Sequence, residues 1–391
     1  MILPFAILPI LNHRLGPDIF GKYAIWISTA TFITVLTDWG FNVYGVSEAS
    51  RRSKNFSDAF EFLIAVSGFK LIVGILVTAC VGLLLLFFSS PENAGHFLAA
   101  AIIILGGITF PLWFYNGIDK VGFALSTIVP LRVFQLFLLL AFVTTPQDLN
   151  LALFLAGMPQ VLSFGLIFFI ASHNGIRLRA LMLSYRIEST IYHVARSTRI
   201  FVSSILSASF TNLSALVLSL FVSKEVVGNF YLADRAIRAL LSLFSAFSSG
   251  VLAERAGPHY KVDGSHFAIR ALFLSLVTAV MVLVCFFTMG QLLLHPLLGE
   301  STGAVLNILG TYIFIIPIVF ASNVLGVQLL LSARYYSAFA NNIMLGIVIY
   351  WILVFPVGFS GGLEGYLYLL LATEFFITTL MYRSCRQNGL A

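Results

Sequence analysis

The chain has 391 residues, of which 59% are apolar and only 10% are charged, and its mean hydropathy is +0.99. Globular domains are about 45–50% apolar and about 25% charged, so this composition excludes an ordinary soluble domain and indicates a helical protein with many membrane spans. In such a chain the net charge of +6 reports orientation, and we expect no nucleic-acid partner. The three cysteines show no metal or redox spacing, so we expect no metal and no cofactor.

Polar breaks divide the chain into twelve apolar segments, which predicts an all-α integral membrane protein with about twelve transmembrane helices. The candidate spans are residues 1–11, 21–47, 58–88, 96–118, 121–144, 149–171, 198–222, 226–253, 267–294, 304–331, 335–358 and 361–382. The first segment, at roughly 16 Å, is too short for a hydrocarbon core of about 30 Å. We therefore expect a truncated first helix, whose true start lies upstream of Met1.

Loop charges predict the orientation, because Lys and Arg are enriched in cytoplasmic loops. With the loop after the second span placed inside, fifteen of the 22 Lys and Arg residues lie in cytoplasmic loops and three lie outside. The remaining four are within spans. This arrangement puts both termini in the cytoplasm if the first helix is complete, in a multi-pass plasma-membrane protein.

A long polar connection separates six spans from six spans. We predict an N-terminal six-helix bundle at 1–175, a basic cytoplasmic linker at 176–197 and a C-terminal six-helix bundle at 198–391. The linker suits a basic helix on the anionic inner leaflet, and a plain solvated linker is the alternative. With an even number of spans in each, the two halves have the same orientation.

Three short segments carry a resemblance to a known family: LGPDIFGKYA at 15–24, TDWGF at 37–41 and VGNFYLADR at 227–235. They resemble polysaccharide-repeat flippases of the Wzx type, in the multidrug/oligosaccharidyl-lipid/polysaccharide exporter superfamily. The resemblance implies a V-shaped, MATE-like pair of bundles in the bacterial inner membrane. It also implies an undecaprenyl-pyrophosphate-linked oligosaccharide as cargo, for polysaccharide or O-antigen (lipopolysaccharide) biosynthesis, with a polymerase and a chain-length protein as candidate partners beside membrane lipids.

Four cations lie near the middle of apolar runs: Lys70, Arg132, Arg235 and Arg238. A charge at that depth costs at least about 2.5 kcal/mol and therefore usually faces the protein interior, a pathway or a partner. We expect these four side chains to bind the anionic cargo, because guanidinium groups bind phosphate oxygens well. The alternative is local ion pairing, above all between Asp234 and Arg238.

Carboxylates within the spans are candidates for a second role. Glu374 lies near the middle of the last span, Asp38 lies toward the cytoplasmic end of the second, and Asp234 precedes Arg235. Such groups can bind H⁺ or Na⁺ and couple an ion gradient to transport. We expect ion coupling or gating at these three positions, with helix packing as the alternative for Asp38.

The sequence lacks the motifs of a nucleotide-driven pump or of a hydrolase. We therefore expect a flippase that works by alternating access and is not an enzyme. One alternative is a cation-coupled multidrug exporter of the same superfamily, although cationic drugs would prefer an acidic cleft. The other is a membrane-embedded polysaccharide polymerase or ligase, which usually has a large external loop that this chain lacks.

Overall fold

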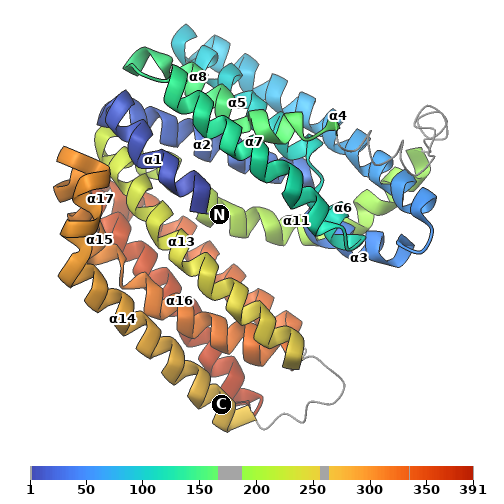
Figure 1. Cartoon of the computed structure of the whole chain (residues 1–391). Coiled ribbons are helices and arrows are strands. Elements are labelled where there is room, and N and C mark those ends of the chain that lie inside the picture. Colours follow the sequence, from blue (N-terminus) through green and yellow to red (C-terminus); the bar gives the residue numbers. More distant parts are fainter. Residues whose placement is uncertain (1, 166–186, 256–263, 334, 391) are drawn as a thin grey trace. The chain divides into compact units, whose positions relative to one another are not determined.

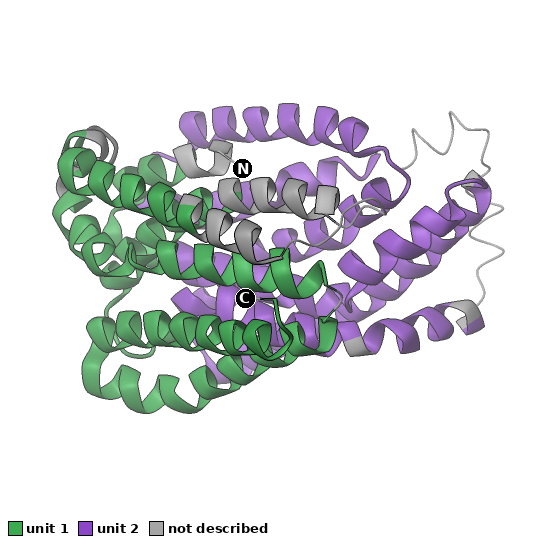
Figure 2. Ribbon diagram, turned by 90° about the horizontal axis from the view of Figure 1, so that it is seen from below, with its two compact units in different colours: residues 1–21, 217–391 green, residues 22–216 purple. Residues whose placement is uncertain are grey.

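The computed structural model describes residues 2–165, 187–255, 264–333 and 335–390. All regular elements in these ranges are helices (Figure 1), which confirms the predicted all-α membrane fold. The chain forms two compact units (Figure 2): unit 1 comprises residues 1–21 and 217–391, and unit 2 comprises residues 22–216.

The helices of unit 2 follow one another along the chain, except that α2 begins in the last residues of the N-terminal part of unit 1. They are α2 (Pro17–Asp38), α3 (Phe41–Arg52), α4 (Phe56–Phe88), α5 (Pro91–Thr109), α6 (Leu112–Gly117), α7 (Val121–Phe142), η1 (Pro146–Asp148), α8 (Leu149–Leu162) and α11 (Ile187–Asn212). The short α12 (Ser214–Leu218) crosses the boundary between the units.

Unit 1 combines the first helix of the chain with those of the C-terminal half. Its elements are α1 (Ile2–Leu15), α13 (Lys224–Arg255), α14 (Gly264–Leu298), η2 (Gly299–Ser301), α15 (Thr302–Tyr312), α16 (Ile315–Asn323), the π-helix η3 (Val324–Leu331) and α17 (Tyr336–Gln387).

Several helices begin where side chains cap the free backbone amides. Asn55 accepts a hydrogen bond from the Ser57 amide before α4. Ser90 accepts one from the Asn93 amide before α5, where Pro91 occupies the first helical position and needs no amide partner. The Ser90 cap lies at the turn between α4 and α5, and the Asn55 cap lies at the turn between α3 and α4.

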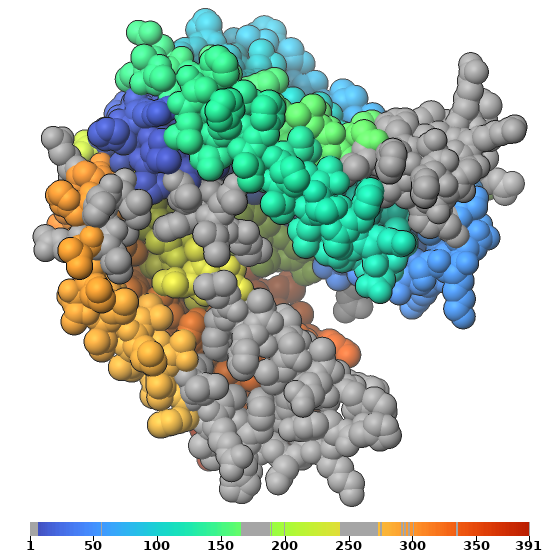
Figure 3. Space-filling view, viewed as in Figure 1, coloured from blue at the N-terminus to red at the C-terminus, as the bar shows by residue number. Residues whose placement is uncertain are grey.

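Apolar side chains on the outside of the helices identify the surface that faces lipid. Five described helices are long and apolar enough to cross a membrane, or six if the bent pair α15 and α16–η3 counts as one span. In α4 only 6% of the most apolar window is buried, and side chains of α7 lie at the surface in Figure 3. The full count of twelve spans remains a prediction.

Three expected spans are interrupted in the structure. Span 21–47 breaks at Trp39–Gly40, span 96–118 breaks at Phe110–Pro111, and span 304–331 bends by 44°. The last two expected spans are joined within α17 at Gly362, where a non-helical backbone with φ of +53° and ψ of −132° separates two helices. Such a φ suits a residue without a Cβ atom. Hydropathy alone misses the breaks at 39–40 and 110–111 because apolar residues continue beyond them.

The joint between α2 and α3 fastens α11 to unit 2. Trp39 and Gly40 both have left-handed backbones, with φ of +50° and +76°. The Trp39 ring stacks on Phe201 with centroids 3.9 Å apart, and its indole N–H donates to Thr198 at 3.3 Å. A Cβ atom on Gly40 would lie 2.9 Å from the Phe201 nitrogen, so α11 packs directly against this backbone.

The compact units divide the chain differently from the predicted domains. Residues 187–197, expected in the linker, form the first turns of α11, and the rest of the linker, 176–186, lies outside the described residues. Contacts place 1–21 with unit 1, and 187–216 with unit 2. The division into two six-span bundles at 1–175 and 198–391 stays a prediction.

Candidate functional site

Lys70 lies on α4 and forms a buried ion pair with Asp38 at the end of α2. Its Nζ donates to Asp38 Oδ1 at 2.8 Å, and both side chains are almost fully buried. The other carboxylate oxygen accepts the amide of Asn42 in the first turn of α3. Asp38 therefore neutralises the Lys70 charge and also caps α3, which ties three helices together.

Arg132 lies on α7, where its hydrogen bonds go to neutral oxygen atoms. Its Nη1 donates to Gln135 Oε1 at 2.9 Å and to the carbonyl of Ala156 on α8 at 3.4 Å. It forms no ion pair with any residue that the structure describes. The arrangement holds the guanidinium in place while leaving its positive charge uncompensated.

Asp234 is the centre of a buried polar group in unit 1. Its Oδ2 accepts a hydrogen bond from Arg238 Nε at 2.7 Å, one helical turn along α13. Its Oδ1 accepts one from the hydroxyl of Tyr312 on α15 at 3.0 Å. The ion pair that the sequence suggested as an alternative to cargo binding is thus formed, and Tyr312 anchors it to a second helix.

Arg235 is held by an aromatic ring instead. Its guanidinium carbon lies 4.6 Å from the centroid of the Tyr231 ring, a cation–π contact that orients the group without neutralising its charge. Its Nε atom is buried and has no hydrogen-bond partner among the described residues. An unmatched donor inside a membrane helix leaves hydrogen-bonding capacity for a ligand.

Glu374 is half-buried on α17. Its carboxylate makes no hydrogen bond or ion pair with the residues that the structure describes, and the cation that acts on it electrostatically is Arg238. Since Arg238 is already bonded to Asp234, no described residue pairs directly with the Glu374 carboxylate.

The four intramembrane cations therefore fall into two classes. Lys70 and Arg238 are compensated by carboxylates, whereas Arg132 and Arg235 are not, as far as the described residues go. Each compact unit holds one cation of each class. Charge-assisted bonds to phosphate oxygens are the chemistry that the two uncompensated guanidinium groups can supply.

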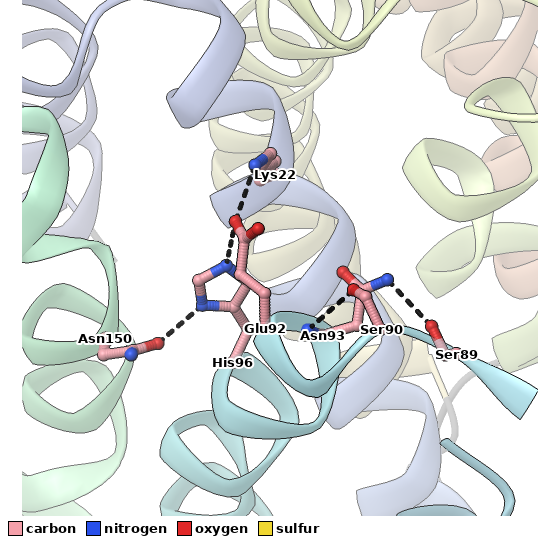
Figure 4. Close-up of polar contacts among 7 residues, drawn as sticks. All are labelled: Lys22, Ser89, Ser90, Glu92, Asn93, His96 and Asn150. Atoms are coloured by element: carbon pink, nitrogen blue, oxygen red, sulfur yellow. Dashed lines mark hydrogen bonds and ion pairs between the residues drawn. The ribbon is translucent and has the colours of Figure 1, made fainter. Parts of the chain in front are cut away.

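Two polar clusters in unit 2 escaped the sequence reasoning. Figure 4 shows the first, at the α4–α5 turn: Lys22 donates to Glu92 at 2.9 Å, and His96 bridges Glu92 and Asn150. The i, i+4 spacing of Glu92 and His96 could have predicted their contact on one helix face. The other two contacts could not be predicted this way, because Lys22 is 70 residues from Glu92 and Asn150 is 54 residues from His96.

The second cluster surrounds His193 on α11. Arg52 can only donate, so Nε2 of His193 accepts its hydrogen bond at 3.2 Å. A neutral His193 then carries its proton on Nδ1, 2.7 Å from the Tyr44 hydroxyl. Burial, and then the charge of Arg52, lower the pKa of His193 below its usual value, which agrees with this neutral form.

Within the described ranges, no group of three or more His, Cys, Asp or Glu side chains is placed to hold a metal ion.

The family described as polysaccharide biosynthesis protein matches residues 1–253. The chain belongs to the polysaccharide biosynthesis protein family. This confirms the resemblance drawn from the three sequence segments.

Relatives of this polysaccharide biosynthesis protein match over nearly their whole length. The "Putative O-antigen transporter" of Escherichia coli (strain K12) is 23% identical, with 100% of this chain and 94% of the relative covered. A protein of the same name from Shigella dysenteriae is 20% identical, with coverages of 98% and 96%. Both are named as transporters, and the prediction of a non-enzymatic protein is confirmed on this ground.

Two solved structures share the fold. The lipid II flippase MurJ, in an inward closed conformation, superposes with a TM-score of 0.77 at 14% identity, covering 98% of this chain and 85% of MurJ. The Vibrio cholerae MATE transporter VcmN gives a TM-score of 0.56 at 13% identity, with coverages of 99% and 95%. At such low identity these matches show the fold of a multi-pass membrane transporter and nothing about cargo.

Proposed function

We propose that this polysaccharide biosynthesis protein transports an O-antigen or related polysaccharide precursor across the bacterial inner membrane. The observation that carries the proposal is the match to O-antigen transporters along essentially the whole chain. The long apolar helices, together with uncompensated guanidinium groups in both units, agree with an anionic cargo that crosses a membrane.

The cargo we propose is an oligosaccharide linked to a lipid through a pyrophosphate. The pyrophosphate loses its hydration in a low-dielectric region and needs donors that replace the lost water. Arg132 and Arg235 are the first candidates, because neither charge is compensated among the described residues. The charges of Lys70 and Arg238 are already compensated by carboxylates, so we assign these two residues a supporting role.

For the energy source and the gate, we propose ion coupling at Glu374 and gating at the two paired carboxylates. Glu374 is free of a hydrogen-bonded partner within the described ranges, so it suits H⁺ or Na⁺ uptake. Asp38 and Asp234 are each hydrogen-bonded to a second or third helix. If those helices move during alternating access, the hydrogen bonds of Asp38 and Asp234 must break and form again.

The proposal also covers the orientation of the chain in the membrane and the proteins that receive its product. Both termini lie in the cytoplasm if the first helix is complete, as the Lys and Arg bias of the loops predicts. The lipid-linked product is passed on the outer side to a polymerase and a chain-length protein. Membrane lipids surround the apolar helices throughout.

Transport by the purified protein in proteoliposomes tests the assignment of the cations. We expect Arg132→Gln and Arg235→Gln each to lower the rate of lipid-linked oligosaccharide transfer by about tenfold or more, since each removes a charge-assisted bond. Arg51→Gln is the matched control, because its side chain is 74% exposed. Unchanged transport in both variants would remove these residues from the mechanism, and efflux of cationic dyes would favour a drug exporter.

A further inference from the structure

The first turn of α2 packs directly on the first turn of α13, and both turns belong to unit 1. A Cβ atom on Gly228 would lie 2.9 Å from the Pro17 carbonyl oxygen and 3.1 Å from the Gly21 nitrogen. A Cβ atom on Gly21 would collide with the Lys224 carbonyl group. The two backbones therefore touch, as small residues allow where helices cross. Both glycines belong to the segments that carry the family resemblance.

This close backbone contact brings together one aromatic side chain from each helix. Phe20 of α2 and Tyr231 of α13 are both buried, and their rings meet edge to face with centroids 6.2 Å apart. Aromatic pairs prefer this geometry, and a close-packed interior leaves a buried ring little room to turn. Contact with Phe20 therefore fixes the orientation of the Tyr231 ring.

The ring of Tyr231 supports the guanidinium group of Arg235. Arg235 follows one helical turn later on the same face of α13, and its guanidinium carbon lies 4.6 Å from the ring centroid. Arg238 is bonded to Asp234, whereas Arg235 has no carboxylate partner among the described residues. A guanidinium that lies over a ring uses its face for that contact and keeps its in-plane N–H donors for hydrogen bonds. Tyr231 therefore holds the charge without occupying the donors that a phosphate group needs.

We propose that Tyr231, held by Phe20, is a positioning residue that presents the Arg235 guanidinium to the phosphate groups of the cargo. A carboxylate in place of the ring would compete with phosphate for the same donors, whereas a neutral aromatic face does not. The inference rests on the proposed function, in which Arg235 binds the pyrophosphate of the cargo. It adds two uncharged residues to that site and gives a reason for the close contact between α2 and α13.

A series of fluorinated rings tests the proposal, because fluorine weakens the negative face of a ring that attracts a cation and changes the ring size little. In the full-length protein in nanodiscs, Tyr231 is replaced by phenylalanine and then by phenylalanine carrying one, two or three fluorine atoms. Calorimetry measures the Kd for inorganic pyrophosphate. The same series at Phe62 is the matched control, because Arg52 lies 5.0 Å from the Phe62 centroid but is bonded to Glu48.

We expect Tyr231→Phe to bind pyrophosphate nearly as well as the wild-type protein, and the Kd to rise stepwise by about tenfold up to the trifluorinated ring. The series at Phe62 should show no trend. A ring that only fills space would also give no trend at Tyr231, so a flat series there, with Arg235→Gln still weakening binding, would overturn the positioning role and leave the proposed function.

Phe20→Leu tests the second half of the proposal, and we expect it to raise the Kd for pyrophosphate about threefold because the edge-to-face contact is lost. An unchanged Kd would remove Phe20 from the proposal. If Phe20→Leu fails to fold, the fluorinated series decides. Absence of pyrophosphate binding, or binding that does not depend on Arg235, would contradict the phosphate-binding role of Arg235 in the proposed function and this inference with it.

Discussion

A buried charge is tolerated in a membrane helix when bonds to other groups replace its lost hydration, and the four cations obtain these bonds in different ways. Lys70 and Arg238 obtain them from carboxylates, Arg132 from an amide and a carbonyl, and Arg235 from an aromatic face. The depth of a residue in a span predicted that all four need partners. Asp38 and the Ala156 carbonyl, which bind Lys70 and Arg132, lie on other helices, whereas Gln135 is three residues from Arg132 on α7.

Removal of one member of the Lys70–Asp38 pair should harm the fold more than removal of both. Lys70→Met leaves the Asp38 carboxylate buried without its cation, which costs about 3–5 kcal/mol for a pair of this kind. Lys70→Met combined with Asp38→Asn should regain most of this loss, because no unpaired charge remains and the amide oxygen still accepts from Asn42. Thermal unfolding in detergent measures the difference, and equal loss in the single and double variants would contradict the pairing.

The His193 cluster predicts a pH dependence with a definite sign. Because the folded-state pKa of His193 is lowered from about 6.5, the unfolded chain binds more protons and the fold loses stability as pH falls below about 6.5. His193→Gln should flatten this part of the curve. Melting temperatures between pH 7.5 and pH 5 test the prediction, and identical curves for the two proteins would contradict it. Asp148, whose pKa is lowered by the amides of Thr144 and Thr145, contributes only at more acidic pH.

At the scale of helices, the sequence did not predict where the backbone departs from a straight span. The alternation of apolar runs and polar loops located the described helices, because hydropathy dominates in a membrane protein. It did not reveal the α2–α3 joint, since apolar residues resume beyond Asp38 and the φ of +50° at Trp39 depends on the contacts with Thr198 and Phe201. Strain of this kind persists only where surrounding structure holds it.

Gly40 is the position where the joint tolerates least change. Gly40→Ala combines a left-handed φ of +76° with a Cβ atom 2.9 Å from the Phe201 nitrogen, so we expect a loss of about 1–3 kcal/mol. Gly122→Ala, inside α7 and free of neighbours, should be neutral or slightly stabilising. Thermal unfolding of the two variants side by side is the measurement, and equal stability would show that α11 does not pack tightly on this backbone.

At the scale of the whole molecule, the family and the membrane class could be predicted from composition and three short segments. The assignment of helices to compact units could not, because it depends on which helices pack together. The first helix of the chain packs in unit 1, and α11 packs in unit 2 through Trp39 and His193. Chain order and loop lengths do not predict that the first helix packs in unit 1 or that α11 packs in unit 2.

We propose that this protein moves a lipid-linked polysaccharide precursor across the inner membrane. The most direct measurement is to delete the gene in the source bacterium and to quantify lipid-linked oligosaccharide on the inner leaflet by mass spectrometry. We predict that the intermediate accumulates there, that surface polysaccharide is lost, and that the wild-type gene restores both while the Arg132→Gln, Arg235→Gln double variant does not. Normal surface polysaccharide without accumulation of the intermediate would contradict the account.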